Sequence, residues 1–297
     1  MYHKPVMLQE CIDFLNIKES GVYVDVTFGG GGHSRLILEK LGKKGKLVGF
    51  DQDDDAVKNA LKDPRFLMIQ ANFSDIASFL RLNGIRKVDG ILADLGVSSF
   101  QLDEASRGFS YRFDAPLDMR MNQQASLDAA KVVNTYSDEK LLKVFSEYGE
   151  VRNSKTLVNH IVKERKVSKV STIQDFLRMI DPVIMGDKFK YMSQVFQAIR
   201  MEVNDELSVL KSFLMATKEV LNEEGRLVVM SYHSLEDRLV KNFMKAGNFE
   251  GALETDFYGN INRPFELILK KSQEASPEEV KSNPRSRSAK LRVCQKI

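Results

Sequence analysis

The stretch that decides the fold is Val22-Tyr-Val-Asp-Val-Thr-Phe-Gly-Gly-Gly-Gly-His-Ser34. Its apolar first half predicts a buried strand, and its glycines predict a tight loop that leads into a helix. Glycine suits such a loop because, without a Cβ, the backbone can turn sharply and approach a ligand closely. A second apolar run follows and ends in Asp51. Nucleoside-binding α/β folds place a ribose-binding acid about 20 residues after a glycine loop, so this stretch indicates a nucleoside cofactor site.

The first third of the chain alternates expected strands with expected helices. Such alternation predicts an α/β fold with a parallel sheet and right-handed crossovers. The expected strands are Val22–Val26, Lys46–Phe50, Phe66–Gln70 and Val88–Asp94, and the expected helices between them include Ser34–Leu41 and Asp53–Lys62.

The middle of the chain has no convincing strand, and its apolar residues recur at helical spacing instead. We therefore expect an inserted all-helical domain at residues 105–203, which divides the α/β domain into residues 1–104 and 204–297. The apolar faces that carry this expectation are Leu141, Leu142, Phe145 and Tyr148; then Leu157, Val158, Ile161 and Val162; and then Ile173, Phe176, Leu177 and Ile180.

The last third resumes the α/β pattern. A long helix with apolar positions from Val203 to Leu221 should end at Gly225, which suits a C-cap. Two late β-like runs should form an antiparallel pair at one edge of the sheet, and the polar segment between them predicts a loop. The elements expected here are the strand Arg226–Ser231, the helix Leu235–Lys245, the paired runs Pro264–Lys270 and Lys290–Gln295, and the loop Ser272–Ser288.

Composition excludes several classes of protein. The net charge of +3 over 297 residues is too small to indicate nucleic-acid binding by itself. Cys11 and Cys294 lie outside any C-x-x-C pattern, which argues against a zinc site or a disulfide framework and for a reducing compartment. From the cysteine pattern we expect no metal. Neither a signal peptide nor a membrane-spanning run is evident, so we also expect no membrane association and a cytoplasmic protein.

The choice of cofactor depends on the glycine loop. A dinucleotide-binding loop needs G-x-G-x-x-G, and here Ser34 occupies the third glycine position. No G-x-x-x-x-G-K-[ST] motif is present, which excludes a P-loop. A late antiparallel pair is typical of S-adenosylmethionine methyltransferases. In that interpretation Gly31 and Gly32 approach the methionine part, Asp51 binds the ribose and Asp94 ends the fourth strand at the ligand-binding edge.

Each of these residues also has a structural interpretation. Asp51 and Asp94 could be turn or helix-cap residues. Phe73, which follows the third strand, could pack against adenine or in the core, and His33 could simply help a helix to start.

Longer motifs occur along essentially the whole chain. They are Thr27–Ser34, Asp94–Asp103, Arg107–Ser110, Pro116–Met121, Phe196–Arg200, Ser231–Arg238 and Asn283–Arg292. In content and in order these motifs closely resemble the RsmH family, formerly MraW. The resemblance implies a class I (Rossmann-like) methyltransferase sheet with a helical substrate-recognition insert. It also implies methyl transfer from S-adenosylmethionine to the N4 amine of a decoding-centre cytidine in 16S ribosomal RNA of the small subunit.

The same resemblance assigns the cofactor contacts residue by residue. The chain departs from the family at Phe100, where proline is common before the glutamine. The implied cofactor contacts are Gly31, Gly32, His33, Asp51, Phe73, Asp94 and Gln101.

Asp94 and His233 are the expected catalytic residues. A carboxylate at Asp94 would lie nearest the reacting centre, and a neutral His233 could orient the base or relay a proton. Alternatively, Ser234 and Asp237 form a helix start around His233. Arg112, Asp118 and Arg120 could shape a cleft or form a structural ion-pair hinge. The expected RNA contacts are Arg285, Arg287, Lys290 and Arg292, because arginines separated by serine suit phosphate.

Two other functions remain open from the sequence. The first is a nicotinamide-dependent oxidoreductase, and the second is a non-enzymatic cofactor-sensing or ribosome-assembly factor. The sequence also leaves the oligomeric state open, with a homodimer as one option.

Overall fold

The computed structural model describes residues 5–255, 257–258 and 261–297. The chain divides into two compact units. The helical unit is Val97–Glu206, and the α/β unit comprises the chain up to Gly96 and from Leu207 onward. The helical unit thus begins before the expected boundary at 105 and includes the short helix α5, Ser99–Asp103.

The α/β unit is built on one twisted sheet with strand order β3-β2-β1-β4-β5-β10-β8. The first five strands are parallel, while β10 runs antiparallel to β5 and to β8. Both the parallel sheet and the late antiparallel pair are therefore confirmed. The strands are β1 Val22–Asp25, β2 Lys46–Asp51, β3 Phe66–Gln70, β4 Val88–Asp94, β5 Leu221–Ser231, β8 Phe265–Leu267 and β10 Lys290–Lys296.

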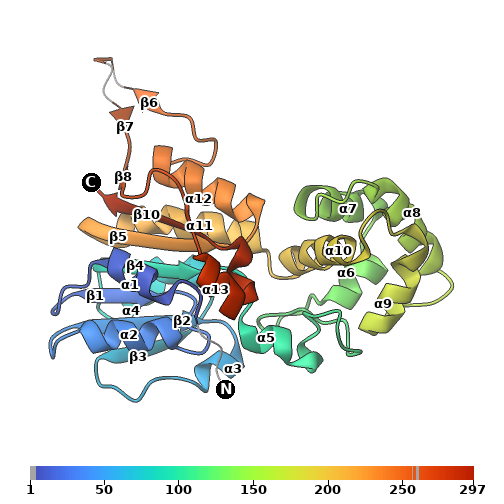
Figure 1. The fold of residues 1–297 in the computed structure, drawn as a ribbon, viewed down its shortest axis with the longest axis horizontal. Helices are drawn as coiled ribbons and strands as arrows, with labels where there is room; N and C mark the ends of the chain where they lie inside the picture. Colours follow the sequence, from blue (N-terminus) through green and yellow to red (C-terminus); the bar gives the residue numbers. More distant parts are fainter. Residues whose placement is uncertain (1–4, 256, 259–260) are drawn as a thin grey trace. The chain divides into compact units, whose positions relative to one another are not determined.

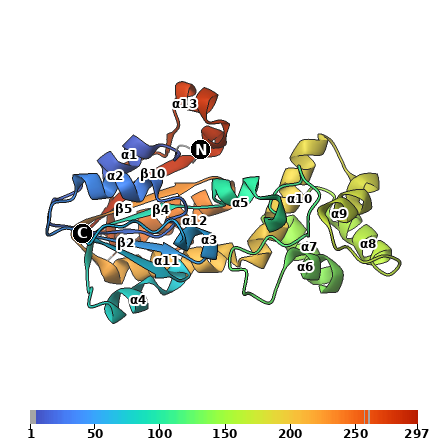
Figure 2. The same cartoon turned by 90° about the horizontal axis from the view of Figure 1, so that it is seen from below.

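Helices cover both faces of this sheet (Figures 1 and 2). Side chains alternate along each strand, so Tyr23 and Leu47 pack with α1 and α2, while Val24 and Val48 pack with α4, α11 and α12. Burial of each large apolar side chain contributes about 1.5–3 kcal/mol to folding. The helices are α1 Leu8–Leu15, α2 Gly32–Lys40, α3 Asp54–Val57, α4 Ile76–Leu82, α11 Glu206–Val220, α12 Ser234–Ala246 and α13 Pro277–Ser282.

The helical unit has its own hydrophobic core. Its described residues include one isolated β-bridge, Pro116 with Thr172, and no strand. The predicted apolar faces are buried, as Leu141, Leu157 and Phe176 illustrate, each at 0% exposure. The other helices are α6 Ala129–Thr135, α7 Asp138–Lys143 with a π-helical turn Val144–Tyr148, α8 Ser154–Glu164, α9 Ile173–Ile180 and α10 Lys188–Val203.

Three local predictions are wrong. Helix α3 is much shorter than the expected Asp53–Lys62, because the Asn59 side chain donates to the carbonyl of Gly29 and draws the following turn onto the glycine loop. Gly225 lies inside β5 rather than at a helix C-cap, and the left-handed residue nearby is Glu224, with φ 61°.

The segment Ser272–Ser288 is also structured rather than an open loop. Strand β9, Gln273–Glu274, pairs with β10, and α13 follows it. Ser276 caps α13, with Pro277 in its first turn. A serine, a proline and two acids in succession are the usual start of a helix, so the sequence did contain this signal.

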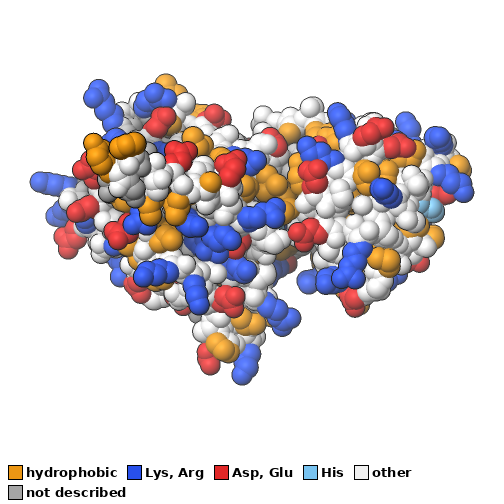
Figure 3. Space-filling model, turned by 90° about the horizontal axis from the view of Figure 1, so that it is seen from above, with side chains coloured by type: hydrophobic (Ala, Val, Ile, Leu, Met, Phe, Trp, Pro, Cys, Tyr) orange, Lys and Arg blue, Asp and Glu red, His pale blue; other side chains and the backbone are white. Residues whose placement is uncertain are grey.

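A second, two-stranded sheet is formed by β6, Glu254–Thr255, and β7, Ile261–Asn262. No helix among the described residues combines the length and the apolar character needed to cross a bilayer. Figure 3 shows basic and acidic side chains interspersed over one face.

Candidate active site

Three carboxyl groups end three neighbouring strands of the sheet. Asp25 ends β1, Asp51 ends β2 and Asp94 ends β4. The chain order reverses between β1 and β4, and ligands of open α/β sheets bind outside the carboxyl ends of the strands at such a point. Burial raises the pKa of each of the three carboxyl groups to about 6.

Asp25 is held entirely by the chain around it. It is 1% exposed, it accepts a 2.7 Å hydrogen bond from the Ser34 hydroxyl, and it accepts another of 3.2 Å from the backbone N–H of Thr27. Ser34, which occupies the third glycine position of the dinucleotide motif, thus ties α2 to the end of β1. Asp25 was not among the predicted site residues, although an acid inside an apolar strand was a visible signal.

Asp51 organises the glycine loop. Its two carboxylate oxygens accept hydrogen bonds from the backbone N–H groups of Gly29 and Asp53, both at 2.9 Å. Each carboxylate oxygen keeps a second lone pair, so these contacts leave capacity for a ribose hydroxyl. The ribose contact itself stays a prediction.

The glycines of the loop lie under neighbouring side chains. Gly31 has φ 73° and begins α2, and a Cβ there would lie 2.8 Å from the Phe28 ring. A Cβ at Gly32 would lie 2.2 Å from Cγ of Pro5. Close approach of protein backbone and side chains is therefore one reason for glycine at both positions.

His33 is 5% exposed, and its Nε2 lies 3.3 Å from the carbonyl oxygen of Val6. Burial lowers the pKa of His33, which favours the neutral ring. The backbone N–H of Met7 then donates to Glu279 in α13 at 2.8 Å. The segment before α1 thus packs against the glycine loop.

Asp94 has the most suggestive environment. The Tyr232 hydroxyl, at the end of β5, donates to Oδ1 of Asp94 at 2.6 Å. The backbone N–H of Asp94 donates to the Thr27 hydroxyl at 2.7 Å. Burial has the largest effect on the pKa of Asp94 and raises it; His33 and the Tyr232 hydroxyl lower it, while Asp25 and Glu236 raise it. Sequence analysis missed Tyr232, although it directly follows the fifth strand.

His233 is the N-cap of α12. Its Nδ1 accepts from the backbone N–H of Glu236 at 3.4 Å, and the Glu236 carboxylate accepts from the backbone N–H of Tyr232 at 3.1 Å. Nε2 of His233 lies 3.1 Å from the Glu236 carboxylate. The helix-start interpretation is therefore correct in kind, but it is displaced by one residue from Ser234 and Asp237. A catalytic role of His233 stays a prediction.

Phe73 and Gln101 have structural contacts of their own. The Phe73 ring meets Phe213 edge-on at 5.3 Å and is partly buried against the core beneath the sheet. Gln101 and Ser98 form a capping box at the start of α5, in the helical unit, with bonds of 3.0 and 3.2 Å. Their predicted cofactor contacts stay predictions.

One of the four predicted RNA contacts, Arg292, already binds another side chain of the protein. Arg292 donates two hydrogen bonds to Asp237, at 2.7 and 3.0 Å, and both side chains of this pair are 12% exposed. This pair joins β10 to α12, and an RNA contact of Arg292 stays a prediction. Arg287 is exposed, while Arg285 and Lys290 are half-buried.

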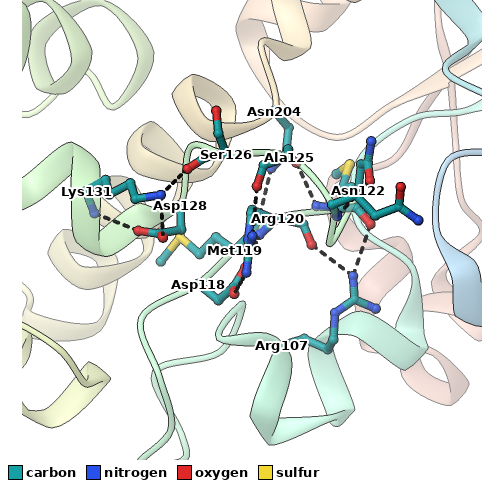
Figure 4. A network of polar contacts seen from close by, with 12 residues as sticks. Arg107, Asp118, Met119, Arg120, Asn122, Ala125, Ser126, Asp128, Lys131 and Asn204 are labelled. Atoms are coloured by element: carbon teal, nitrogen blue, oxygen red, sulfur yellow. Dashed lines mark hydrogen bonds and ion pairs between the residues drawn. The ribbon is translucent and has the colours of Figure 1, made fainter.

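In the helical unit, Asp118 and Arg120 form a structural pair rather than an open site. Their side chains meet at 2.6 Å, and Arg120 also donates to the carbonyl of Ala125 at 2.8 Å (Figure 4). Arg107 donates to the carbonyls of Arg120 and Met121. Of our two interpretations, the ion pair that stabilises a loop is the one the geometry favours.

The charge of the site discriminates between cofactors. The charged groups that act on Asp51 are Asp53 and Asp25, and those that act on Asp94 are His33, Asp25 and Glu236. Such a set of hydrogen-bond acceptors suits hydroxyl groups and a positively charged centre, and it would repel a pyrophosphate. The residues present therefore fit an adenosyl sulfonium better than a nicotinamide dinucleotide.

Comparison with known proteins agrees with this geometry. A relative named ribosomal RNA small subunit methyltransferase H, from Parabacteroides distasonis, is 55% identical over 298 residues. The alignment covers 100% of this chain and 98% of the relative. The protein of the same name from Flavobacterium psychrophilum is 54% identical over 291 residues, and the alignment covers 98% of this chain and 100% of that protein. The model of the MraW methylase family matches residues 1–297, including the glycine loop and every strand-end carboxylate described above. The resemblance is thus confirmed, and the chain belongs to the MraW methylase family.

Proposed function

We propose that this protein transfers a methyl group from S-adenosylmethionine to the N4 amine of a decoding-centre cytidine in 16S ribosomal RNA. The names of relatives at 55% and 54% identity support a small-subunit ribosomal RNA substrate. The observation that carries the chemistry is the contact between Asp94 and Tyr232 beside the glycine loop. The reaction takes place in the cytoplasm, on the small ribosomal subunit.

Asp51 and the loop that it holds would bind the adenosyl part of the cofactor. The ribose hydroxyls would donate to the free lone pairs of Asp51, and Phe73 would offer an edge to adenine. S-adenosylmethionine supplies a methyl group already activated by the positive sulfur to which it is bonded. The protein therefore has mainly to align the acceptor and to exclude alternatives.

Asp94 would act on the acceptor amine. The lone pair of a cytosine amine is delocalised into the ring, so a hydrogen-bond acceptor at the N–H favours the pyramidal nitrogen that can attack. Tyr232 occupies Oδ1 of Asp94, and Oδ2 would accept the N–H of the substrate. When the methyl group passes from sulfur to the amine nitrogen, with the carbon–sulfur bond broken as the N–C bond forms, the nitrogen would become positive and Asp94 would accept the proton that it loses.

Tyr232 compensates for a motif that the chain lacks. Many amino-methylating enzymes carry an Asn/Asp-Pro-Pro-Tyr turn after the fourth strand, whereas this chain has Asp94-Leu-Gly-Val97. Here a tyrosine from the end of the neighbouring strand β5 lies on the strand-end acid instead. An amine target is compatible with this arrangement.

The substrate can be tested directly. Purified protein is given methyl-labelled S-adenosylmethionine and small ribosomal subunits that lack the modification, and the RNA fragments are then mapped by mass spectrometry. We expect one methyl group on the amine of one decoding-centre cytidine. A methyl group on a ribosomal protein, on another nucleotide or on a ring carbon would contradict the proposal.

A further inference from the structure

Helix α12 presents a row of cations to solvent. Arg238, Lys241 and Lys245 are spaced by three and four residues, so they share one face of the helix, and all three are exposed. The opposite face, with Val240 and Phe243, is buried against the sheet. None of the three cations has an ion-pair partner within the described part of the chain.

The far end of this row borders a hollow of about 130 Å³. Lys270, which follows β8, closes the rim opposite α12 and is also exposed. The floor is apolar, so the hollow offers a surface for a planar or sugar ring between positive charges. Figure 3, seen from the side of α12, shows basic side chains gathered in the middle of its left half. The rim is Lys241, Lys245 and Lys270, the apolar floor is Met244, Leu267 and Leu269, and Arg292, which is paired with Asp237, also lines the hollow.

The row begins close to the reacting centre. Helix α12 starts immediately after Tyr232 and His233, so Arg238 lies in its second turn. With a rise of 1.5 Å per residue, Lys245 is about 10 Å farther along the axis than Arg238. A flexible strand whose nucleotide reaches Asp94 could therefore place its next phosphates over these cations.

We propose that Arg238, Lys241, Lys245 and Lys270, which we call the α12 track, bind the ribose-phosphate backbone of the substrate RNA beside the target nucleotide. The apolar hollow would receive a ribose or base of the same strand. This inference rests on the proposed function, and it adds an RNA-binding surface separate from the segment at Arg285 and Arg287. Such contacts help to offset the few kcal/mol needed to extrude a base from its stack.

The test compares two double variants. K241A/K245A removes half of the α12 track, while K43A/K44A removes two exposed lysines from the turn between α2 and β2, at the opposite end of the strands. Each protein is titrated with a 16S RNA fragment that contains the target cytidine, at several salt concentrations. For K241A/K245A we expect the slope of log affinity against log salt to fall by about 1.4, about 0.7 for each of two phosphates. The control should keep the wild-type slope.

Methylation of small subunits gives a second readout. In K241A/K245A the KM for RNA should rise several-fold, while kcat at saturating RNA and the affinity for S-adenosylmethionine stay unchanged. K241R/K245R should restore the slope, because arginine also binds phosphate. Thermal unfolding of all variants confirms that the fold is intact.

The outcomes separate this inference from the proposed function. If wild-type protein methylates the cytidine and K241A/K245A keeps its salt slope and KM, the α12 track is not an RNA site. If K241A/K245A loses activity on assembled subunits but binds free RNA normally, the track binds a ribosomal protein, and the inference is again wrong. If the wild type itself neither binds nor methylates RNA, the proposed function fails.

Discussion

The ends of β1 and β4 both carry an aspartate whose pKa is raised by burial, yet the two residues differ in access and in partners. Burial raises the pKa of Asp25 and of Asp94 alike to about 6. Asp25 is 1% exposed and is bound by Ser34 and Thr27 within its own β1–α2 turn. Asp94 is only half-buried and is held by Tyr232 from another strand. A raised pKa therefore does not by itself separate a structural acid from a candidate catalytic acid, whereas access and a partner from another strand distinguish Asp94 from Asp25.

The largest effect should follow removal of the charge at the accessible site. Asp94→Asn keeps an oxygen for the Tyr232 hydroxyl, so the fold should persist. It removes the carboxylate that would accept the amine proton, and we expect single-turnover methylation to fall by about 10²–10⁴-fold. Binding of S-adenosylmethionine, measured by calorimetry, should remain detectable. Near-normal turnover in this variant would remove Asp94 from the mechanism.

The corresponding change beside the buried Asp25 should lower the stability of the fold. Ser34→Ala leaves Asp25 buried with one hydrogen bond fewer, which should lower the free energy of unfolding by about 1–3 kcal/mol. Denaturant titration measures this loss, and Ser168→Ala, an exposed serine of the helical unit, serves as control. If Ser34→Ala keeps its stability but loses activity, the end of β1 is not purely structural, and our distinction between Asp25 and Asp94 is wrong.

The pH dependence of the rate should report Asp94. Because the pKa of Asp94 is raised to about 6, its carboxylate is lost as pH falls through 6, and kcat/KM should fall with it. The Tyr232 hydroxyl lowers this pKa, so Tyr232→Phe should move the acid limb to higher pH and reduce the rate about tenfold near neutral pH.

A merely structural tyrosine would not move the pH profile. Tyr23→Phe, in which the hydroxyl that accepts from the backbone N–H of Lys18 is removed, is the control and should keep the wild-type acid limb. His33, Asp25, Glu236 and Cys11 also face this region and act on Asp94 or are acted on by it. An unshifted limb in Tyr232→Phe would show that another of these groups sets the profile.

The smallest expected effect is proton release on cofactor binding. A positive sulfur near Asp94 and Asp51 should lower the pKa of both carboxyl groups, so binding of S-adenosylmethionine near pH 6 should release a fraction of a proton. Calorimetry in buffers of different ionisation enthalpy measures this number. The demethylated product has a neutral sulfur and should release fewer protons. Equal release by both ligands would place the sulfur away from the carboxylates.

Apolar runs predicted the sheet well, because the four central strands β2, β1, β4 and β5 are largely buried and leave a clear pattern in the sequence. The antiparallel pairing of β8 with β10 was also correct. The short elements were harder to predict, since tertiary contacts decide them. Helix α3 ends early because Asn59 binds the Gly29 carbonyl, and α13 docks through Glu279. Neither contact leaves a periodic signal.

The candidate site was predicted only where single residues end strands. Asp51 and Asp94 follow apolar runs, so their placement at one edge could be anticipated. The place of Tyr232 after β5 was visible in the sequence, but its contact with Asp94 was not, because the two residues are 138 positions apart in the chain. The pairing of Arg292 with Asp237 could not be predicted for the same reason, since it depends on the packing of β10 beside α12.

The hydrogen bond between Met7 and Glu279 joins positions 272 residues apart. Contacts between residues so far apart form late in folding, because the entropy cost of closing the long loop must be met before the contact stabilises the fold. We therefore expect the flank of the glycine loop to close late, when α13 docks. Before this contact forms, β1 and its glycines lie beside an unbraced rim, so the ability to bind the donor should develop only after α13 has docked.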